Sequence, residues 1–237
     1  MVTPQTRLDT DKNSLRSYAD VTRIFTENSD LALAPRKWPC QARSRATVDA
    51  ILEATALLLE ERKSCSTNAI AERAGVGIAT LYQYFDGRDG VIAALSRQVR
   101  ARLAHTVASA LETACRQSLR EGVRSLVLAA VQADTERPLL AARLDEIEAK
   151  LPLETDHRQI MTELCAAVAA FLERQNVAYG VKAETLATDL CTIAGALIDA
   201  ARGRTGTIEG DQLTRITGQL LAVIQADASV KDVGDAR

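Results

Sequence analysis

The chain has 237 residues, of which 47% are hydrophobic, 3% aromatic and 25% charged, and its formal net charge is −2. It has no apolar run of the ~20 residues that a membrane-spanning helix needs, and its N-terminal segment lacks the apolar stretch of a secretory signal peptide. These features argue against a membrane or exported protein, and we expect a cytoplasmic one.

Charge is distributed unevenly along the chain. Residues 35–100 carry ten Lys or Arg against seven Asp or Glu, a balance of +3, whereas residues 101–237 carry 15 against 19, a balance of −4. A basic segment beside an acidic one fits a DNA-binding head on a body that does not touch DNA.

The residues that commonly ligate metals show no metal-binding pattern. The two histidines, His105 and His157, have no ligand partner three or four positions further on, so no metal site is expected. The cysteines are odd in number, widely spaced and without a C-x-x-C pair, which predicts reduced thiols rather than disulfides or a zinc site; they are Cys40, Cys65, Cys115, Cys165 and Cys191.

In chain order, residues 1–34 show no sustained apolar period, and we expect a flexible arm there. A first amphipathic helix is predicted from about Ser44, because apolar residues then recur at helical spacing, at Val48, Ile51, Leu52, Thr55, Leu58 and Leu59. The charged residues 60–63 and the turn-forming residues 64–67 follow it.

A short second helix is predicted over residues 68–74. Ser66 or Thr67 would cap its N-terminus, because a hydroxyl oxygen accepts from otherwise unpaired N–H groups. Gly75 would end it in a left-handed conformation. A third helix is predicted over 78–85, a turn at 86–89 and a long helix over 89–115.

The rest of the chain reads as helices over 119–134, 137–150, 155–177, 182–202 and 209–226, with a loop over 203–210 and no convincing strand. The predicted fold class is therefore all-α. We expect a helix-turn-helix domain of three helices over 35–88, a larger helical body over 89–227 and a flexible tail over 228–237.

The segment 67–85, TNAIAERAGVGIATLYQYF, has the features of a helix-turn-helix. Ala71 is small enough for two helices to cross closely, and Gly75 gives the tight turn a permissive backbone. The exposed face of the second helix would carry polar side chains able to meet base edges in a major groove.

The stretch Arg36–Leu95 resembles the TetR family of transcriptional regulators. The resemblance is carried by RSRATVDAILEATALLL at 43–59, STNAIAERAGVGIATLYQYF at 66–85 and DGRDGVIAAL at 86–95. It implies an all-α homodimer whose first three helices bind DNA, whose long fourth helix joins head to body and whose last two helices form the dimer interface. Such proteins usually have Gly where the first helix ends, whereas this chain has Glu60-Glu61-Arg62-Lys63.

Residue by residue, the resemblance implies ten DNA contacts, some to phosphates and some to bases: Arg43, Arg45, Thr67, Asn68, Ala79, Thr80, Tyr82, Gln83, Tyr84 and Arg88. Tyr82 or Tyr84 could instead belong mainly to the core. Arg36 and Lys37 could reach a minor groove or form an ordinary solvated stretch. Leu81 and Phe85 are assigned to the core.

The body is expected to hold a dimer interface and a small-molecule pocket. Two apolar stripes predict the interface, with an ordinary intrachain core as the alternative: Leu186, Leu190, Ile193, Leu197, Leu213, Ile216, Leu220 and Val223. Candidate pocket residues, not separable from core by sequence, are Leu103, Val107, Leu126, Leu144, Ile147, Met161, Leu164, Val168 and Phe171. Cys65 is either an oxidation sensor or a small core residue.

Three functions are compatible with these patterns. The sequence favours a repressor that leaves a near-palindromic operator when a small molecule binds, with no cofactor. A regulator without a small-molecule ligand is the second possibility. An enzyme is the third and the least favoured, because the chain has no phosphate-binding glycine loop and no nucleophile or metalloprotease motif.

Overall fold

The computed structural model describes residues 32–37, 39–175, 180–205 and 208–234, and within these ranges the protein has nine helices and no strand. This confirms the predicted all-α fold class. The helices are α2 (Ala42–Glu60), α3 (Thr67–Ala74), α4 (Ile78–Tyr84), α5 (Gly87–Ala114), α6 (Leu119–Thr135), α7 (Pro138–Glu148), α8 (Glu154–Arg174), α9 (Ala183–Thr205) and α10 (Gly210–Gly234).

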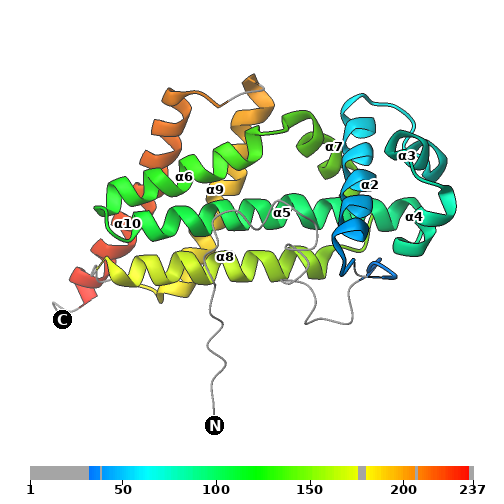
Figure 1. Cartoon of the computed structure of the whole chain (residues 1–237). Coiled ribbons are helices and arrows are strands. Elements are labelled where there is room, and N and C mark those ends of the chain that lie inside the picture. Colours follow the sequence, from blue (N-terminus) through cyan, green and yellow to red (C-terminus); the bar gives the residue numbers. More distant parts are fainter. Residues whose placement is uncertain (1–31, 38, 176–179, 206–207, 235–237) are drawn as a thin grey trace, which may run out of the picture.

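The helices form a small head and a larger body that share one long helix. In Figure 1, α2, α3 and α4 lie at one end, and α5 runs from that end along the length of the body. Helices α6 and α8 both pack on α5, while α9 packs on α8 and on α10. Among the described residues no helix combines the length and hydrophobicity of a membrane span.

Helix α7 lies between the body helices α6 and α8 in sequence but contributes to the core of the head. Leu140 and Leu144 of α7 are each 2% exposed and belong to the same buried cluster as Ile51, Leu81 and Phe85. A second buried cluster is formed by α5, α6, α8, α9 and α10. The head is therefore packed against the body through α7 as well as through the continuous α5.

Most helix ends lie close to their predicted positions, and two differences concern the C-terminal helices. Helix α9 continues to Thr205, into the predicted loop, and α10 continues to Gly234, into the range predicted as a flexible tail. Asp227 supplies a physical reason for the longer α10. Its Oδ2 accepts hydrogen bonds from the backbone N–H groups of Gly180 (2.9 Å) and Val181 (3.4 Å), which ties α10 to the segment just before α9.

The segment that precedes α2 is held against α5. The guanidinium of Arg97 is buried and donates hydrogen bonds to the carbonyl oxygens of Ala32 (2.5 Å) and Leu33 (3.2 Å). Residues 32–34 were predicted to belong to a flexible arm, and this part of the prediction is wrong. The rest of the predicted arm, 1–31, lies outside the described residues.

Helix α2 ends in a left-handed turn without glycine. Arg62 has φ = +53°, a conformation that costs an L-residue ~1–2 kcal/mol. The N–H of Arg62 donates to the carbonyl of Leu59 (3.1 Å), and the N–H of Lys63 donates to that of Leu58 (3.0 Å). This pair of bonds is the Schellman motif. Helix α2 thus has the C-terminal geometry that glycine normally allows, but Arg62 occupies the left-handed position.

We expect Arg62→Gly to raise the free energy of unfolding by about 1 kcal/mol, because glycine adopts this conformation without the steric cost. Urea denaturation measures the change. Arg62→Ala removes the same side chain but retains Cβ, so it should give no such gain. Equal stability of the glycine and alanine variants would show that the left-handed turn is not strained.

Candidate nucleic-acid interface and internal cavity

The crossing of α3 and α4 has the geometry of a helix-turn-helix. The side chain of Ser66 accepts a hydrogen bond from the N–H of Ala69 (3.2 Å), which caps α3. Gly75 ends α3 at φ = +66°, and Ala71, which is 4% exposed, lies buried between the helices. The predicted cap, turn and small crossing residue are confirmed.

Helix α4 presents a short face to solvent. Ala79 and Gln83 are exposed and Thr80 is half-buried, while Tyr82 is 43% exposed. Leu81 is fully buried, as predicted. The face offers a methyl group, a hydroxyl, an amide and a phenol within two helical turns, which is the chemistry that reads base edges and phosphates.

Tyr84 does not belong to that face. It is 8% exposed and packs in the same buried cluster as Phe85, so its prediction as a groove-facing residue is wrong. Helical spacing explains the error. Tyr84 lies three residues after Leu81 and therefore on the buried side of α4. Phe85, assigned to the core from the sequence, is fully buried.

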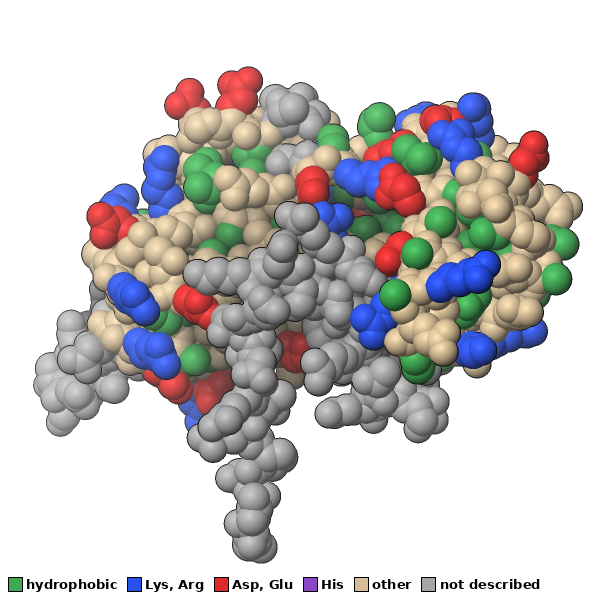
Figure 2. All heavy atoms as spheres, viewed as in Figure 1, with side chains coloured by type: hydrophobic (Ala, Val, Ile, Leu, Met, Phe, Trp, Pro, Cys, Tyr) green, Lys and Arg blue, Asp and Glu red, His purple; other side chains and the backbone are tan. Residues whose placement is uncertain are grey.

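The N-terminus of α2 adds basic residues close to α4. A hollow of about 360 Å³ is lined by Lys37, Cys40, Gln41, Arg43, Ser44, Thr47 and Tyr84. Arg43 and Arg45 are both exposed, and in Figure 2 basic side chains follow the lower edge of the end that holds α2–α4. Cations beside a helix N-terminus suit a phosphate group.

The remaining predicted DNA contacts, Thr67, Asn68 and Arg88, differ in exposure and in their hydrogen-bond partners. At the start of α3, Asn68 is exposed and Thr67 is half-buried. Arg88 is used internally: its Nε donates to the carbonyl of Cys65 (3.0 Å) and its Nη1 pairs with Asp89 (2.8 Å). It therefore ties the turn before α3 to α5. Arg36 likewise forms an ion pair with Asp86 (2.6 Å).

Cys65 lies in the core of the head rather than on a reactive surface. It is 8% exposed, and burial raises the pKa of its thiol. A buried thiol with a raised pKa has little of the thiolate form that reacts with oxidants. The structure therefore favours the second interpretation of Cys65, a small core residue.

The body contains a cavity of about 430 Å³ between α5, α6, α7, α8 and α9, and its lining includes residues of α10. Eight of the nine predicted pocket residues line it: Leu103, Val107, Leu126, Leu144, Met161, Leu164, Val168 and Phe171. Ile147 does not, and it packs instead against the core of the head. The volume lies within the range of small-molecule sites.

Ionisable side chains lie at the α7 and α9 walls of the cavity. One nitrogen of Arg202, Nη2, lies 3.0 Å from Oδ2 of Asp145 and 3.0 Å from Oδ1 of Asp199. Arg100 forms an ion pair with the buried Glu148. Sequence periodicity revealed none of these residues, because it detects apolar faces and not charges that converge from different helices.

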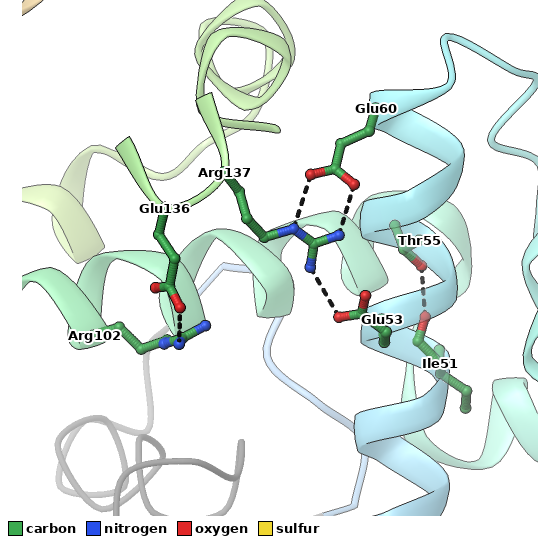
Figure 3. Close-up of polar contacts among 7 residues, drawn as sticks. All are labelled: Ile51, Glu53, Thr55, Glu60, Arg102, Glu136 and Arg137. Atoms are coloured by element: carbon green, nitrogen blue, oxygen red, sulfur yellow. Dashed lines mark hydrogen bonds and ion pairs between the residues drawn. The ribbon is translucent and has the colours of Figure 1, made fainter. Parts of the chain in front are cut away.

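Arg137 joins the cavity to the head. It lines the cavity, yet its guanidinium forms a bidentate pair with Glu60 (2.8 and 2.7 Å) and a third bond with Glu53 (2.8 Å), both on α2. The neighbouring Glu136 pairs with Arg102 of α5 (2.9 Å). Figure 3 shows these contacts on either side of the turn between α6 and α7. One dipeptide thus contacts the head helix and the long helix.

Arg137→Ala is expected to lower the free energy of unfolding by about 1–2 kcal/mol, a modest value because the carboxylates are partly solvated. Arg137 lowers the pKa of Glu60 from its usual 4.5. The ionised pair therefore contributes to the free energy of unfolding above pH 4.5, and this contribution is lost as the pH falls through the lowered pKa of Glu60. Urea denaturation at pH 7 and pH 3 should show a difference between wild type and variant that shrinks in acid.

Arg102→Ala is the matched control for that measurement. It removes an arginine from an exposed pair with the adjacent Glu136, whose side chains are 48% and 57% exposed. It should change stability by less than about 0.5–1 kcal/mol. A loss of stability as large as that of Arg137→Ala would mean that the ion pairs between Arg137 and α2 contribute no more than an exposed surface pair.

The two predicted dimer stripes mainly face the interior of the same chain. Leu186, Leu190, Leu213, Ile216 and Leu220 are all less than 8% exposed and belong to the buried cluster of the body. Ile193, Leu197 and Val223 are partly buried against that cluster. The five buried side chains belong to the intrachain core, which was the alternative interpretation, whereas Ile193, Leu197 and Val223 keep part of their surface exposed.

Comparisons with known proteins agree with this geometry. The family model described as "Bacterial regulatory proteins, tetR family" matches residues 51–95. No curated protein matches the sequence. The chain is similar to a putative TetR-family regulator from Mesorhizobium loti (TM-score 0.65, 11% identity, 78% of this chain and 98% of that one). It is also similar to LfrR from Mycobacterium smegmatis in complex with proflavine (TM-score 0.53, 20% identity, 78% and 98%).

The fold and the exposed α4 face define a helix-turn-helix transcriptional regulator with an all-helical body. Residues 51–95, which comprise the second half of α2, all of α3 and α4 and the start of α5, are similar to the TetR family. The predicted resemblance is thereby confirmed.

Proposed function

We propose that this regulator is a homodimeric repressor that binds a near-palindromic operator and leaves it when a small molecule occupies the cavity of the body. The exposed face of α4 carries the first part of the proposal, because it is polar, short and next to the basic N-terminus of α2. Two such heads at a fixed distance would enter successive major grooves.

The link between cavity and head supports the second part. Leu140 and Leu144 each belong to the core of the head and line the cavity. Arg137 also lines the cavity and binds α2. A ligand that favours another position of α7 would therefore change the packing beneath the DNA-binding helices. It shifts the equilibrium only by its difference in affinity for the two arrangements. The relative LfrR holds a small molecule, proflavine, in its own structure.

A cavity of this size argues against a regulator without a ligand, the second function that the sequence allows. Catalysis receives no support from the described part of the chain. The cavity wall there is mainly aliphatic, and its arginines and carboxylates are engaged in ion pairs.

DNA binding by the purified protein to fragments from around its own gene, at two salt concentrations, tests the proposal. Selective binding that weakens steeply with salt is expected, because phosphate contacts release counterions. Weak binding of equal strength to all fragments, at both salt concentrations, would contradict sequence-selective DNA binding by this protein.

The dimer would use the outer faces of α9 and α10. These faces expose small residues: Ala196 on α9 and, one turn apart on α10, Gly218 and Ala222. Small residues let helices approach one another closely. A Cβ added at Gly218 would meet no other described atom within 4 Å, so a substitution there leaves the packing of its own chain in place at that atom.

Gly218→Arg is therefore expected to convert the dimer to a monomer without unfolding it. Analytical ultracentrifugation measures the mass, and circular dichroism reports the helices. Ala142→Arg, at an exposed position of α7, is the control and should remain dimeric. A dimeric Gly218→Arg variant would place the interface elsewhere.

A further inference from the structure

Residues 32–37, the brace, lie between the long helix α5 and the end of α4. At the α5 end, the buried guanidinium of Arg97 donates hydrogen bonds to the carbonyl oxygens of Ala32 (2.5 Å) and Leu33 (3.2 Å). Leu33 has φ = +55°, a left-handed conformation that is strained for an L-residue. Such a conformation persists only where its surroundings fix it, and Arg97 holds the peptide groups on both sides of Leu33.

The middle of the brace packs against the body. Pro35 is buried, and Ala34 packs on a small buried cluster formed by Ala101 of α5 and Ile160 of α8. The next residue of α8, Met161, lines the cavity of the body. The brace therefore contacts two of the helices that enclose the cavity.

The other end of the brace contacts the C-terminus of α4. The N–H of Arg36 donates to the carbonyl of Tyr84 (2.8 Å), the last residue of α4, and the Arg36 guanidinium pairs with Asp86 (2.6 Å). Carbonyl groups in the last turn of a helix have no partner within it, so the brace supplies a donor from outside.

Helix α4 needs such contacts because its own ends are weak. It has seven residues, and its N-cap, Gly77, makes no side-chain hydrogen bond. A helix this short is not stable by itself and depends on tertiary packing. A hydrogen bond from the brace to its C-terminus therefore helps to fix its orientation.

We propose that Arg97 is a positioning residue for operator binding, which acts through the brace by holding α4 in the orientation that DNA requires. The proposal rests on the proposed function, in which α4 is the recognition helix. Arg97 is 1% exposed, so it cannot reach a phosphate and affects DNA only through the segment it holds. The brace also connects body and head without α7.

Arg97→Met tests the proposal in the full-length protein. Methionine keeps an unbranched apolar side chain in the buried position but cannot donate the two hydrogen bonds, so it releases the brace. Hydrogen exchange followed by mass spectrometry should show ~10-fold faster exchange over residues 32–37 and 78–84, with exchange in α10 unchanged. Binding to the tightest-binding DNA fragment from around the protein's own gene, followed by fluorescence anisotropy, should weaken ~10-fold.

Two further variants separate positioning from packing and from charge. Arg97→Lys retains a cation that can donate to the same carbonyl groups, and it should recover most of the DNA affinity. Arg124→Ala removes the same charge from an exposed position of α6 and should bind DNA like the wild type. Wild-type exchange over 32–37 and 78–84 in Arg97→Met would overturn the proposal, as would faster exchange with unchanged DNA affinity.

Ala34→Lys provides an independent test that leaves Arg97 in place. A lysine at this half-buried position displaces the brace from α5 and α8, because its charge has to stay hydrated. DNA binding should weaken although the added positive charge by itself favours DNA. Faster exchange together with wild-type or tighter binding would overturn the proposal. Selective DNA binding by the wild type tests the proposed function separately, whereas exchange is measured without DNA.

Discussion

Tyr82→Ala should weaken binding to operator DNA ~10-fold or more while leaving the free energy of unfolding almost unchanged. Tyr82 is 43% exposed on α4, so its loss removes a DNA contact worth about 1–3 kcal/mol but little packing. Fluorescence anisotropy with a labelled operator measures the first quantity, and urea denaturation measures the second. Thr80→Ala, on the same helix, should show the same pattern.

Tyr84→Ala is the matched contrast, two residues away and with the same side chain removed. Tyr84 is 8% exposed within the core of the head, so its truncation should cost about 3–5 kcal/mol of stability, as for large buried aromatic residues. If both variants are stable and both lose DNA binding, the two tyrosines share the interface and the assignment of Tyr84 to the core fails. If Tyr82→Ala binds operator like the wild type, α4 is not the recognition helix.

Leu140→Ala is expected to lower the free energy of unfolding by about 2–5 kcal/mol, the range for buried leucines. Leu140 is 2% exposed, packs in the core of the head and lines the cavity. The truncation therefore removes packing from the head and enlarges the cavity at the same time. Urea denaturation followed by circular dichroism measures the loss.

The adjacent leucine provides the control. Leu139 is 65% exposed on the same helix, and Leu139→Ala should change stability by less than about 0.5 kcal/mol. A similar loss in both variants would show that α7 contributes through its helix propensity and not through the packing of Leu140.

The head was the part of the molecule that could be predicted best from the sequence. The short range of its interactions explains this: Ser66, Ala71 and Gly75 act within one turn of their neighbours. The failure at Tyr84 is of the same local kind, because an aromatic residue near the exposed face of a short helix does not reveal on which side its ring packs.

The body could be predicted only as a set of helices. Helical periodicity identified Leu190 and Leu220 as apolar, but a stripe facing its own core and a stripe facing a partner have the same period. The carboxylates of Asp145 and Asp199 meet one arginine from separate helices, and Arg137 reaches α2 across a long stretch of chain. Such convergence depends on tertiary packing and leaves no local pattern.

The position of α7 limits how this protein can be recombined with its relatives. A chimera cut between α4 and α5, the boundary that the sequence suggests, would transfer the DNA-binding helices without Leu140 and Leu144, which complete their core. Its head would expose apolar surface. The DNA specificity of that head would then depend on how it packs against the body of the other protein. A functional exchange therefore has to transfer α7 and Arg137 together with the head, or redesign both sides of that contact. The segment that can be recombined between relatives is larger than the segment proposed to contact DNA.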